Sequence, residues 1–205
     1  MNTDCKYVIG IDQSYTRTGI TVLENKQIYK MLSLDFKGCK TNTEKRELLS
    51  EIINNIINEL DSDNITILTE RIRLRSQGFL SENYIKSTGA LIATIIDVAS
   101  TYDINVYSVD TRSWKSQIVG NSKPLNNPYG INPEKYRTIL YLRDKGLLKY
   151  IAEQYKGRGK KGVINVKIEG QRVPCKINDD LADSYCIAMY GCLPKSKQKL
   201  KEEKF

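Results

Sequence analysis

The sequence predicts a single mixed α/β domain, in which a mixed five-stranded sheet is flanked by helices. Three short apolar runs follow one another near the N-terminus, and an amphipathic helical segment comes next. Two further apolar runs are each followed by a helix. This order of elements, βββαβαβ and then helices, is typical of a mixed sheet. At 205 residues, the chain has the length of one domain with room for insertions.

The strands are expected where apolar residues lie between turn-forming residues. The first strand ends in Asp12, and a polar turn separates it from the second. The last strand ends in Asp110, and Asp110 and Thr111 can cap a following short helix through Trp114 and Lys115. In chain order, the strands are predicted at residues 6–12, 17–24, 27–34, 64–70 and 104–110.

The helices are recognised by apolar residues at helical spacing. Thr43 is placed to cap the first helix. The second helix is long and carries small residues at Gly89, Ala90 and Ala93 among its apolar positions. A loop rich in Gly, Pro and Asn separates the short helix from the next one. The main helices are predicted at residues 43–60, 81–102, 134–148 and 179–192.

A basic insertion interrupts the domain at residues 156–176. It holds seven Lys or Arg residues against one acid, Glu169, and an alternating VINVKI segment. We expect a basic β-hairpin or a flexible arm, and a solvated polar loop is the alternative. The domain is expected to span residues 1–193, and the charged tail at 194–205 is expected to fray.

The composition limits the chemistry and the compartment. The net charge is +8 and the chain has no histidine, which excludes His-based triads and His metal sites. The five cysteines form no C-x-x-C pair, so reduced thiols are expected. Without a long apolar run or a signal-like N-terminus, the sequence predicts a soluble cytoplasmic protein with no membrane partner.

Acidic residues end two predicted strands and begin the last helix. Asp12 and Glu70 stand at the strand ends, where α/β sheets usually build their sites. Asp180 and Asp183 are three residues apart and therefore share one helix face, with Asp179 as an alternative to Asp180. Each acid also has an ordinary interpretation, as a turn residue, a loop residue or a helix cap. Their joint occurrence favours a site.

Four carboxylates close together repel one another unless a cation lies among them. Oxygen ligands without His or Cys favour Mg²⁺ or Mn²⁺. We therefore expect two Mg²⁺ ions per site, with Mn²⁺ as a substitute and Asp12 as the bridging ligand. Such a pair of ions supports phosphodiester hydrolysis by in-line attack of water. No small-molecule cofactor is expected.

Four segments resemble, in order, the motifs of the RuvC family of Holliday-junction resolvases, within the RNase H-like superfamily. They are IGIDQSYTRTGI, ILTERIRLRS, VDTRSWKSQIVG and DDLADSYCIAMYG, and the likeness runs from residue 6 to about 193. The resemblance implies an RNase H-like fold and a homodimeric endonuclease of DNA recombination and repair. Such an enzyme resolves four-way junctions by paired symmetric nicks.

The resemblance also implies roles for single residues. It assigns catalysis and metal binding to the four acids Asp12, Glu70, Asp180 and Asp183. Lys115 matches a lysine that the family uses near the scissile phosphate, where it would stabilise developing charge. Lys135 matches a second family lysine.

The chain departs from the bacterial pattern in several places. Arg73 stands where bacterial members carry an aromatic residue that stacks at the junction centre. Phe79 is the candidate replacement, and its alternative role is a hydrophobic contact at the start of a helix. The insertions at 121–131 and 156–176 indicate a divergent relative, of a kind that phages encode. A phage-encoded protein would act in the host cytoplasm.

Basic residues supply candidate contacts to DNA. Arg71, Arg73 and Arg75 alternate directly after Glu70, so on an extended segment they project to one side and can line a phosphate channel. A charged edge strand is the alternative. Lys160 and Lys161 lie in the basic insertion and can follow a duplex arm. The helix at 81–102 is the expected dimer interface, or else an ordinary core helix.

Three other functions are compatible with parts of the pattern. The first is an RNase H-like nuclease that acts on structured RNA or an RNA–DNA hybrid. The second is an actin-like or sugar-kinase-type ATP-binding protein, which would need a second copy of the fold that this chain lacks. The third is a junction-binding protein without catalysis, against which the presence of all four acids argues.

Overall fold

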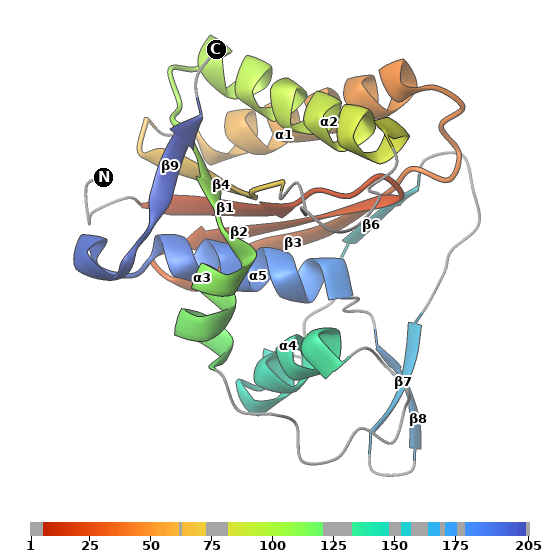
Figure 1. Ribbon diagram of the computed structural model, residues 1–205, viewed down its shortest axis with the longest axis vertical. Helices are drawn as coiled ribbons and strands as arrows, with labels where there is room; N and C mark the ends of the chain where they lie inside the picture. The colour runs from red at the N-terminus through yellow and green to blue at the C-terminus, as the bar shows by residue number, and fades with distance from the viewer. Residues whose placement is uncertain are drawn as a thin grey trace.

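The computed structural model describes residues 6–61, 63–72, 82–120, 133–147, 153–156, 164–168, 171–175 and 179–203. Its centre is a seven-stranded sheet with the order β6-β3-β2-β1-β4-β5-β9 (Figure 1). The strands of this sheet are β1 Tyr7–Asp12, β2 Arg17–Glu24, β3 Gln27–Asp35, β4 Ile65–Glu70, β5 Val106–Val109, β6 Glu153–Lys156 and β9 Leu200–Glu203. The five predicted strands are all present, and β6 and β9 extend the sheet at its two edges.

The pairing of the strands decides where their ends lie. β1 is antiparallel to β2, and β2 is antiparallel to β3. β1 runs parallel to β4, which runs parallel to β5. The carboxyl ends of β1, β4 and β5 therefore meet at one edge of the sheet.

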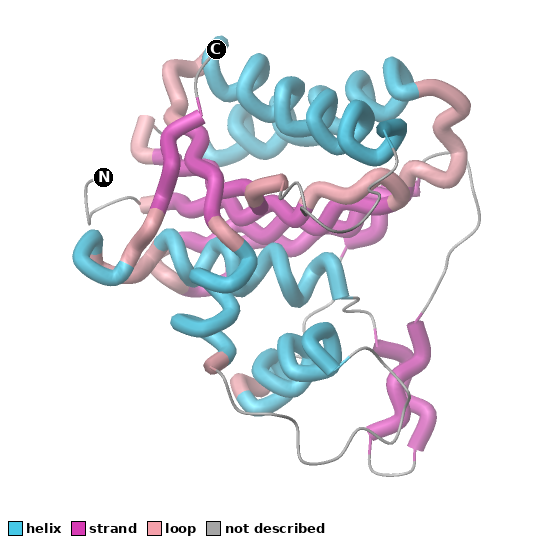
Figure 2. Tube along the Cα trace, viewed as in Figure 1, coloured by secondary structure: helices cyan, strands magenta, loops and turns pink. Residues whose placement is uncertain are grey.

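Helices cover both faces of the sheet, as Figures 1 and 2 show. Large aliphatic residues of α1 and α2 pack on one face, in a core with β1–β4 residues such as Ile9 and Ile67. α5 lies on the other face with α3 and α4, in a core around Trp114 and Tyr190. The helices are α1 Asn42–Leu60, α2 Glu82–Thr101, α3 Thr111–Trp114, α4 Pro133–Asp144 and α5 Asp179–Gly191.

The start of α1 corrects one prediction. The capping residue is Thr41, not Thr43, because the Thr41 hydroxyl accepts a hydrogen bond from the Glu44 amide at 3.1 Å. The Glu44 carboxylate in turn accepts from the Lys40 amide at 2.7 Å. This reciprocal pair resembles a capping box, and it starts the helix one residue earlier than the apolar spacing indicates.

The C-terminal segment corrects a second prediction. Residues Leu200–Glu203 do not fray but form β9, which pairs antiparallel with β5. The Gln198 side chain anchors the segment, because its amide donates to three carbonyl groups at the end of α5. The Ser108 hydroxyl also donates to Glu203 at 2.5 Å. These polar contacts give a charged segment a fixed place at the sheet edge.

The basic insertion contains the predicted hairpin. β7 Ile164–Ile168 pairs antiparallel with β8 Gln171–Cys175 in a separate two-stranded sheet. β6 lies just before it and pairs in parallel with β3, which the sequence did not predict. Across the described parts of the chain, none of the helices has the length and apolar character needed to cross a membrane.

Candidate active site at the carboxyl edge of the sheet

Two acids stand at the ends of neighbouring parallel strands. Asp12 is the last residue of β1, and Glu70 is the last residue of β4. Gln13 joins the two strand ends, because its side-chain amide donates to the Glu70 carbonyl at 2.5 Å and accepts from the Glu70 amide at 3.3 Å. This two-way bond continues the sheet ladder by one side chain. It therefore fixes the spacing between the two acids.

Close packing of α5 brings two more acids to the same edge. A Cβ atom on Gly10 would run into the backbone of Ser184 and Ala188, and one on Gly19 would run into the backbone of Asp180. The helix can approach β1 and β2 this closely only because both positions are glycine. The Thr21 and Ser184 hydroxyls are 2.8 Å apart across the interface. The first turn of α5 is thereby held beside the end of β1.

Asp12 lies at the centre of the group of acids. Its side chain is buried, and burial raises the pKa of this carboxyl well above its usual range. Repulsion from the neighbouring carboxylates raises the pKa further. These neighbours are Glu70, Asp183, Asp180 and Asp179, in decreasing order of effect. The repulsion shows that the acids at the strand ends and the acids of α5 lie near Asp12.

Asp183 is half-buried, and its carboxyl group lies in a mixed environment. Burial raises its pKa to about 7, with repulsion from Glu70 in the same direction, while the positive charge of Lys115 opposes the shift. The Thr138 side chain hydrogen-bonds to the carboxylate from α4. The other oxygen, Oδ1, is buried and has no hydrogen-bond partner. A buried carboxylate oxygen without a donor is suited to a cation.

Trp114 orients the Glu70 carboxylate. Its indole Nε1 donates to Glu70 Oε1 at 3.2 Å, and the ring itself is fully buried. α3 begins directly after β5 because Asp110 caps it, accepting from the Arg112 amide at 2.9 Å, as the sequence predicts. Because β5 is the parallel neighbour of β4, the start of α3 brings Trp114 close to Glu70 at the end of β4.

Lys115 follows Trp114 in a short π-helix, Lys115–Val119. Its ammonium lies 5.1 Å from the centre of the Trp114 ring and acts electrostatically on Asp183. π-Helical turns are uncommon and are found often at functional sites. The structure therefore brings Lys115, which the resemblance picked out, to the group of acids.

Arg17 is a member of the site that the sequence did not reveal. It begins β2, and its guanidinium donates to Asp180 Oδ2 through Nε and to Asp179 Oδ1 at 3.2 Å. One cation therefore lies against both acids at the start of α5. The available signal was a single arginine directly before Thr18-Gly19, within the same segment as Asp12.

The residues at this edge suit a hard divalent cation by their chemistry. The donors are carboxylates, and the orphaned oxygen of Asp183 lies among them. As the side chains stand, no three acids, cysteines or histidines of the described segments already form a group that could hold a metal ion. Arg17 explains part of this, because it occupies Asp180. A cation would therefore have to compete with the guanidinium for that carboxylate.

The structure covers the predicted DNA contacts unevenly. Arg71 is half-buried, and its Nε donates to the Ser108 hydroxyl at 3.2 Å, so its side chain lies across β5. Six other candidates fall outside what the structure describes, Lys135 by its side chain and the other five entirely: Arg73, Arg75, Phe79, Lys135, Lys160 and Lys161. Their roles remain predictions.

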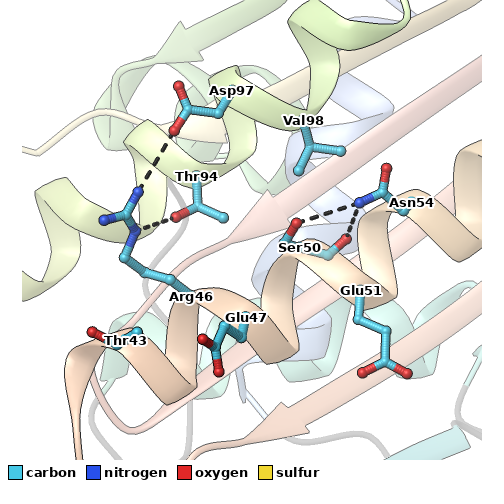
Figure 3. Close-up of a pocket in the computed structure, with 9 residues that line it drawn as sticks. All are labelled: Thr43, Arg46, Glu47, Ser50, Glu51, Asn54, Thr94, Asp97 and Val98. Carbon is cyan, nitrogen blue, oxygen red and sulfur yellow. Dashed lines mark hydrogen bonds and ion pairs between the residues drawn. The ribbon is translucent and has the colours of Figure 1, made fainter.

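A groove of about 480 Å³ lies between α1 and α2 (Figure 3). Arg46 crosses it, donating to the Thr94 hydroxyl at 2.9 Å and pairing with Asp97 at 3.6 Å. None of the acids of the candidate site lines this groove. It belongs to the opposite face of the sheet from α5.

Comparison with known proteins finds relatives by fold but none by sequence. No profile of a known protein family matches the chain, and no curated protein matches it. Among solved structures, RuvC of Thermus thermophilus in complex with a Holliday junction substrate aligns with a TM-score of 0.60 at 13% identity, over 91% of this chain and 93% of that chain. The chain has the RuvC fold.

One further RuvC structure supports this assignment. A second Thermus thermophilus RuvC structure aligns with a TM-score of 0.57 at 14% identity, over 96% of this chain and 99% of that chain. The yeast mitochondrial Holliday junction resolvase Ydc2 gives a TM-score of 0.47 at 14% identity, over 90% and 76%. The two RuvC alignments confirm the RNase H-like fold that the motifs implied.

Proposed function

We propose that this chain is a divalent-metal-dependent endonuclease that cuts branched DNA, with the four-way junction as its substrate. The observation that carries the proposal is the group of buried and half-buried acids around Asp12 at the carboxyl edge of a RuvC-fold sheet. Burying mutually repelling carboxylates costs stability, which a purely structural role would not require. The basic net charge of +8 suits a polyanionic substrate.

The metal ligands in this proposal are Asp12, Glu70, Asp180 and Asp183. Mg²⁺ fits their oxygen donors, and Mn²⁺ would substitute for it. When bound, such ions neutralise charge on the phosphate and favour attack of water on phosphorus. Trp114 and Thr138 keep Glu70 and Asp183 in place, since each donates a hydrogen bond to one carboxylate.

Lys115 has a separate role in the proposal. Its ammonium is positioned by the π-helix beside the acids, so it can face the phosphate oxygens as charge develops on them. A Lys115→Met variant would keep most of the side-chain length and remove the charge. We expect slower cleavage with unchanged Mn²⁺ affinity, measured by single-turnover kinetics and calorimetry. Weaker metal binding in this variant would instead assign Lys115 to the stability of the site.

Paired nicks require two active sites, so we propose a homodimer that forms through α2. Gly89, Ala90 and Ala93 are only half-buried there, and a Cβ atom on Gly89 would meet nothing within 4 Å. A Gly89→Trp variant should therefore keep the fold of each chain and dissociate the dimer. Sedimentation of the wild type should give twice the 23.4 kDa chain mass. A wild-type monomer at micromolar concentration would contradict paired cutting.

The test of the function is cleavage of labelled substrates in Mg²⁺ by wild type and Asp12→Asn. We expect symmetric nicks in a four-way junction and little cutting of linear duplex. The variant should lose activity on the order of 1,000-fold while it still binds the junction, because ligand loss removes several kcal/mol of charge stabilisation. Equal cutting of three-way junctions would broaden the substrate class. Cutting of structured RNA or an RNA–DNA hybrid without DNA cleavage would overturn the DNA assignment.

A further inference from the structure

An exposed aromatic side chain lies on the loop that leaves Asp12. Tyr15 is 43% exposed, three residues beyond the end of β1. An exposed ring does not contribute the hydrophobic stabilisation that it would gain if a ligand covered it. Tyr15 follows Asp12 closely in the chain, on the loop that leads from the candidate active site to β2.

The loop that carries Tyr15 is held on several sides. The Ser14 hydroxyl bonds to the backbone of Arg17, donating to its carbonyl and accepting from its amide. The Thr16 carbonyl accepts from the Phe36 amide at 3.0 Å. Gln13 is tied to Glu70 at the start of the loop. The backbone under the ring is therefore fixed, and the side chain is presented from a defined position.

A buried lysine supports the ring from below. Lys45 of α1 is only 6% exposed, and its ammonium lies 3.3 Å from the centre of the Tyr15 ring. The same ammonium donates to the Tyr15 carbonyl at 3.0 Å and lies 5.9 Å from the Phe36 ring centre. Burying the Lys45 ammonium costs free energy, and its attraction to the Tyr15 ring offsets part of that cost. The same contact holds one face of the ring in place.

We propose that Tyr15, supported by Lys45, is a stacking platform for an unpaired nucleobase of the branched substrate. An aromatic ring that is rigidly held at one face and exposed to solvent is suited to base stacking, which needs no particular sequence. The inference rests on the proposed function and adds a contact to it.

The experiment measures binding and base stacking without cleavage, in Ca²⁺. The probes are a four-way junction with 2-aminopurine at the exchange point, a single strand with 2-aminopurine, and a linear duplex with the same base paired. The variants are Tyr15→Ala and Tyr15→Phe. Tyr29→Ala is the matched control, because Tyr29 is also 43% exposed but packs against Tyr7 at the start of β1. Melting temperatures verify that each variant is folded.

The platform predicts a selective loss. Tyr15→Ala should weaken junction binding by about 5- to 150-fold, the range for one base stacked on an aromatic ring, and abolish the change in 2-aminopurine fluorescence. Tyr15→Phe should stay within about twofold of wild type, since stacking needs the ring and not the hydroxyl. Duplex binding should be unchanged in both variants, and Tyr29→Ala should match wild type with every probe.

The outcomes separate the platform from the proposed function. Full junction affinity in folded Tyr15→Ala, or an equal loss for junction and duplex, would overturn the platform and leave the nuclease proposal standing. If wild type ignored the junction but bound the single strand through Tyr15, the platform would stand and the junction assignment would fall. Binding of none of the probes by wild type would overturn both.

Discussion

The two faces of the central sheet are packed in different ways. On the α1 and α2 face, large aliphatic residues such as Leu49, Ile53 and Ile95 fill the space between helix and strands. On the α5 face, glycine at Gly10 and Gly19 lets the helix backbone come directly against the strands. The first face buries apolar surface. The second buries carboxylates as well, and it does so at the edge where β1 and β4 end.

This difference shows how the fold can remain stable although several carboxylates lie close together around Asp12. The aliphatic face stabilises the fold by burying large apolar side chains. On the close-packed face, the acids repel one another, and this repulsion opposes folding. The hydrophobic stabilisation of the other face offsets that cost. The same substitution should therefore have different consequences on the two faces.

The largest expected effect comes from adding a side chain at Gly10, where α5 packs directly against β1. A Gly10→Ala variant would push a methyl group into the backbone of α5, so we expect destabilisation of about 3 kcal/mol or more and loss of cleavage. For a domain of this size, the melting temperature should fall by about 6–12 °C. Ile53→Val on the other face is the control, with an expected cost of about 0.5–1.5 kcal/mol and normal cleavage per folded molecule. Equal effects of the two variants would contradict the comparison.

The next effect is a pH dependence that arises only on the α5 face. The folded-state pKa of Asp183 is raised to about 7, above its ordinary value of 3.8, so the folded chain holds a proton that the unfolded chain releases. The contribution to stability is therefore present at low pH and is lost as the pH rises through about 7. The metal-free protein should melt lower at about pH 8 than at about pH 5.5.

Two additions sharpen this pH prediction. Asp183→Asn should make the profile less steep, with the remaining pH dependence carried by Asp12, whereas Asp97→Asn on α2 should leave the profile unchanged. Mg²⁺ should raise the melting temperature more at about pH 8 than at about pH 5.5, because it binds the deprotonated carboxylates. A profile that is the same in wild type and Asp183→Asn would show that this carboxyl does not carry the effect.

A smaller effect is expected from the hydrogen bond that orients Glu70. Trp114→Phe keeps an aromatic ring and removes the indole donor, so cleavage should slow by about tenfold, as for loss of one hydrogen bond to a charged group. Tyr102→Phe is the counterpart on the other side of the sheet, directly after α2, where the hydroxyl bonds to Asn54 and Asn58 of α1. It should cleave at the wild-type rate. Single-turnover kinetics would distinguish the two.

The smallest effect concerns Arg17 and the competition for Asp180. Arg17→Gln removes the cation that pairs with this acid, so Mn²⁺ should bind about fivefold more tightly while the metal-free protein melts lower. Arg46→Gln, which removes a cation paired with Asp97 on the other face, should leave Mn²⁺ affinity unchanged. Titration calorimetry gives both values. Weaker Mn²⁺ binding in Arg17→Gln would mean that Arg17 holds Asp180 ready for the ion.

The sequence alone determined the five central strands, the main helices and the grouping of Asp12, Glu70 and the α5 acids. Apolar periodicity reports which face of each element is buried, and parallel strands bring their carboxyl ends together. Capping residues were harder to place, because several polar residues near a helix start can serve, as Thr41 and Thr43 show.

Only the tertiary structure decided the rest. β6 and β9 depend on free sheet edges that local sequence does not encode, and β9 depends on contacts from Gln198 to the end of α5. Arg17 and Lys45 likewise act on groups far away in the chain or on another element, namely Asp180 and the Tyr15 ring. Such partners are set by the approach of packed elements, which no pattern within one element records.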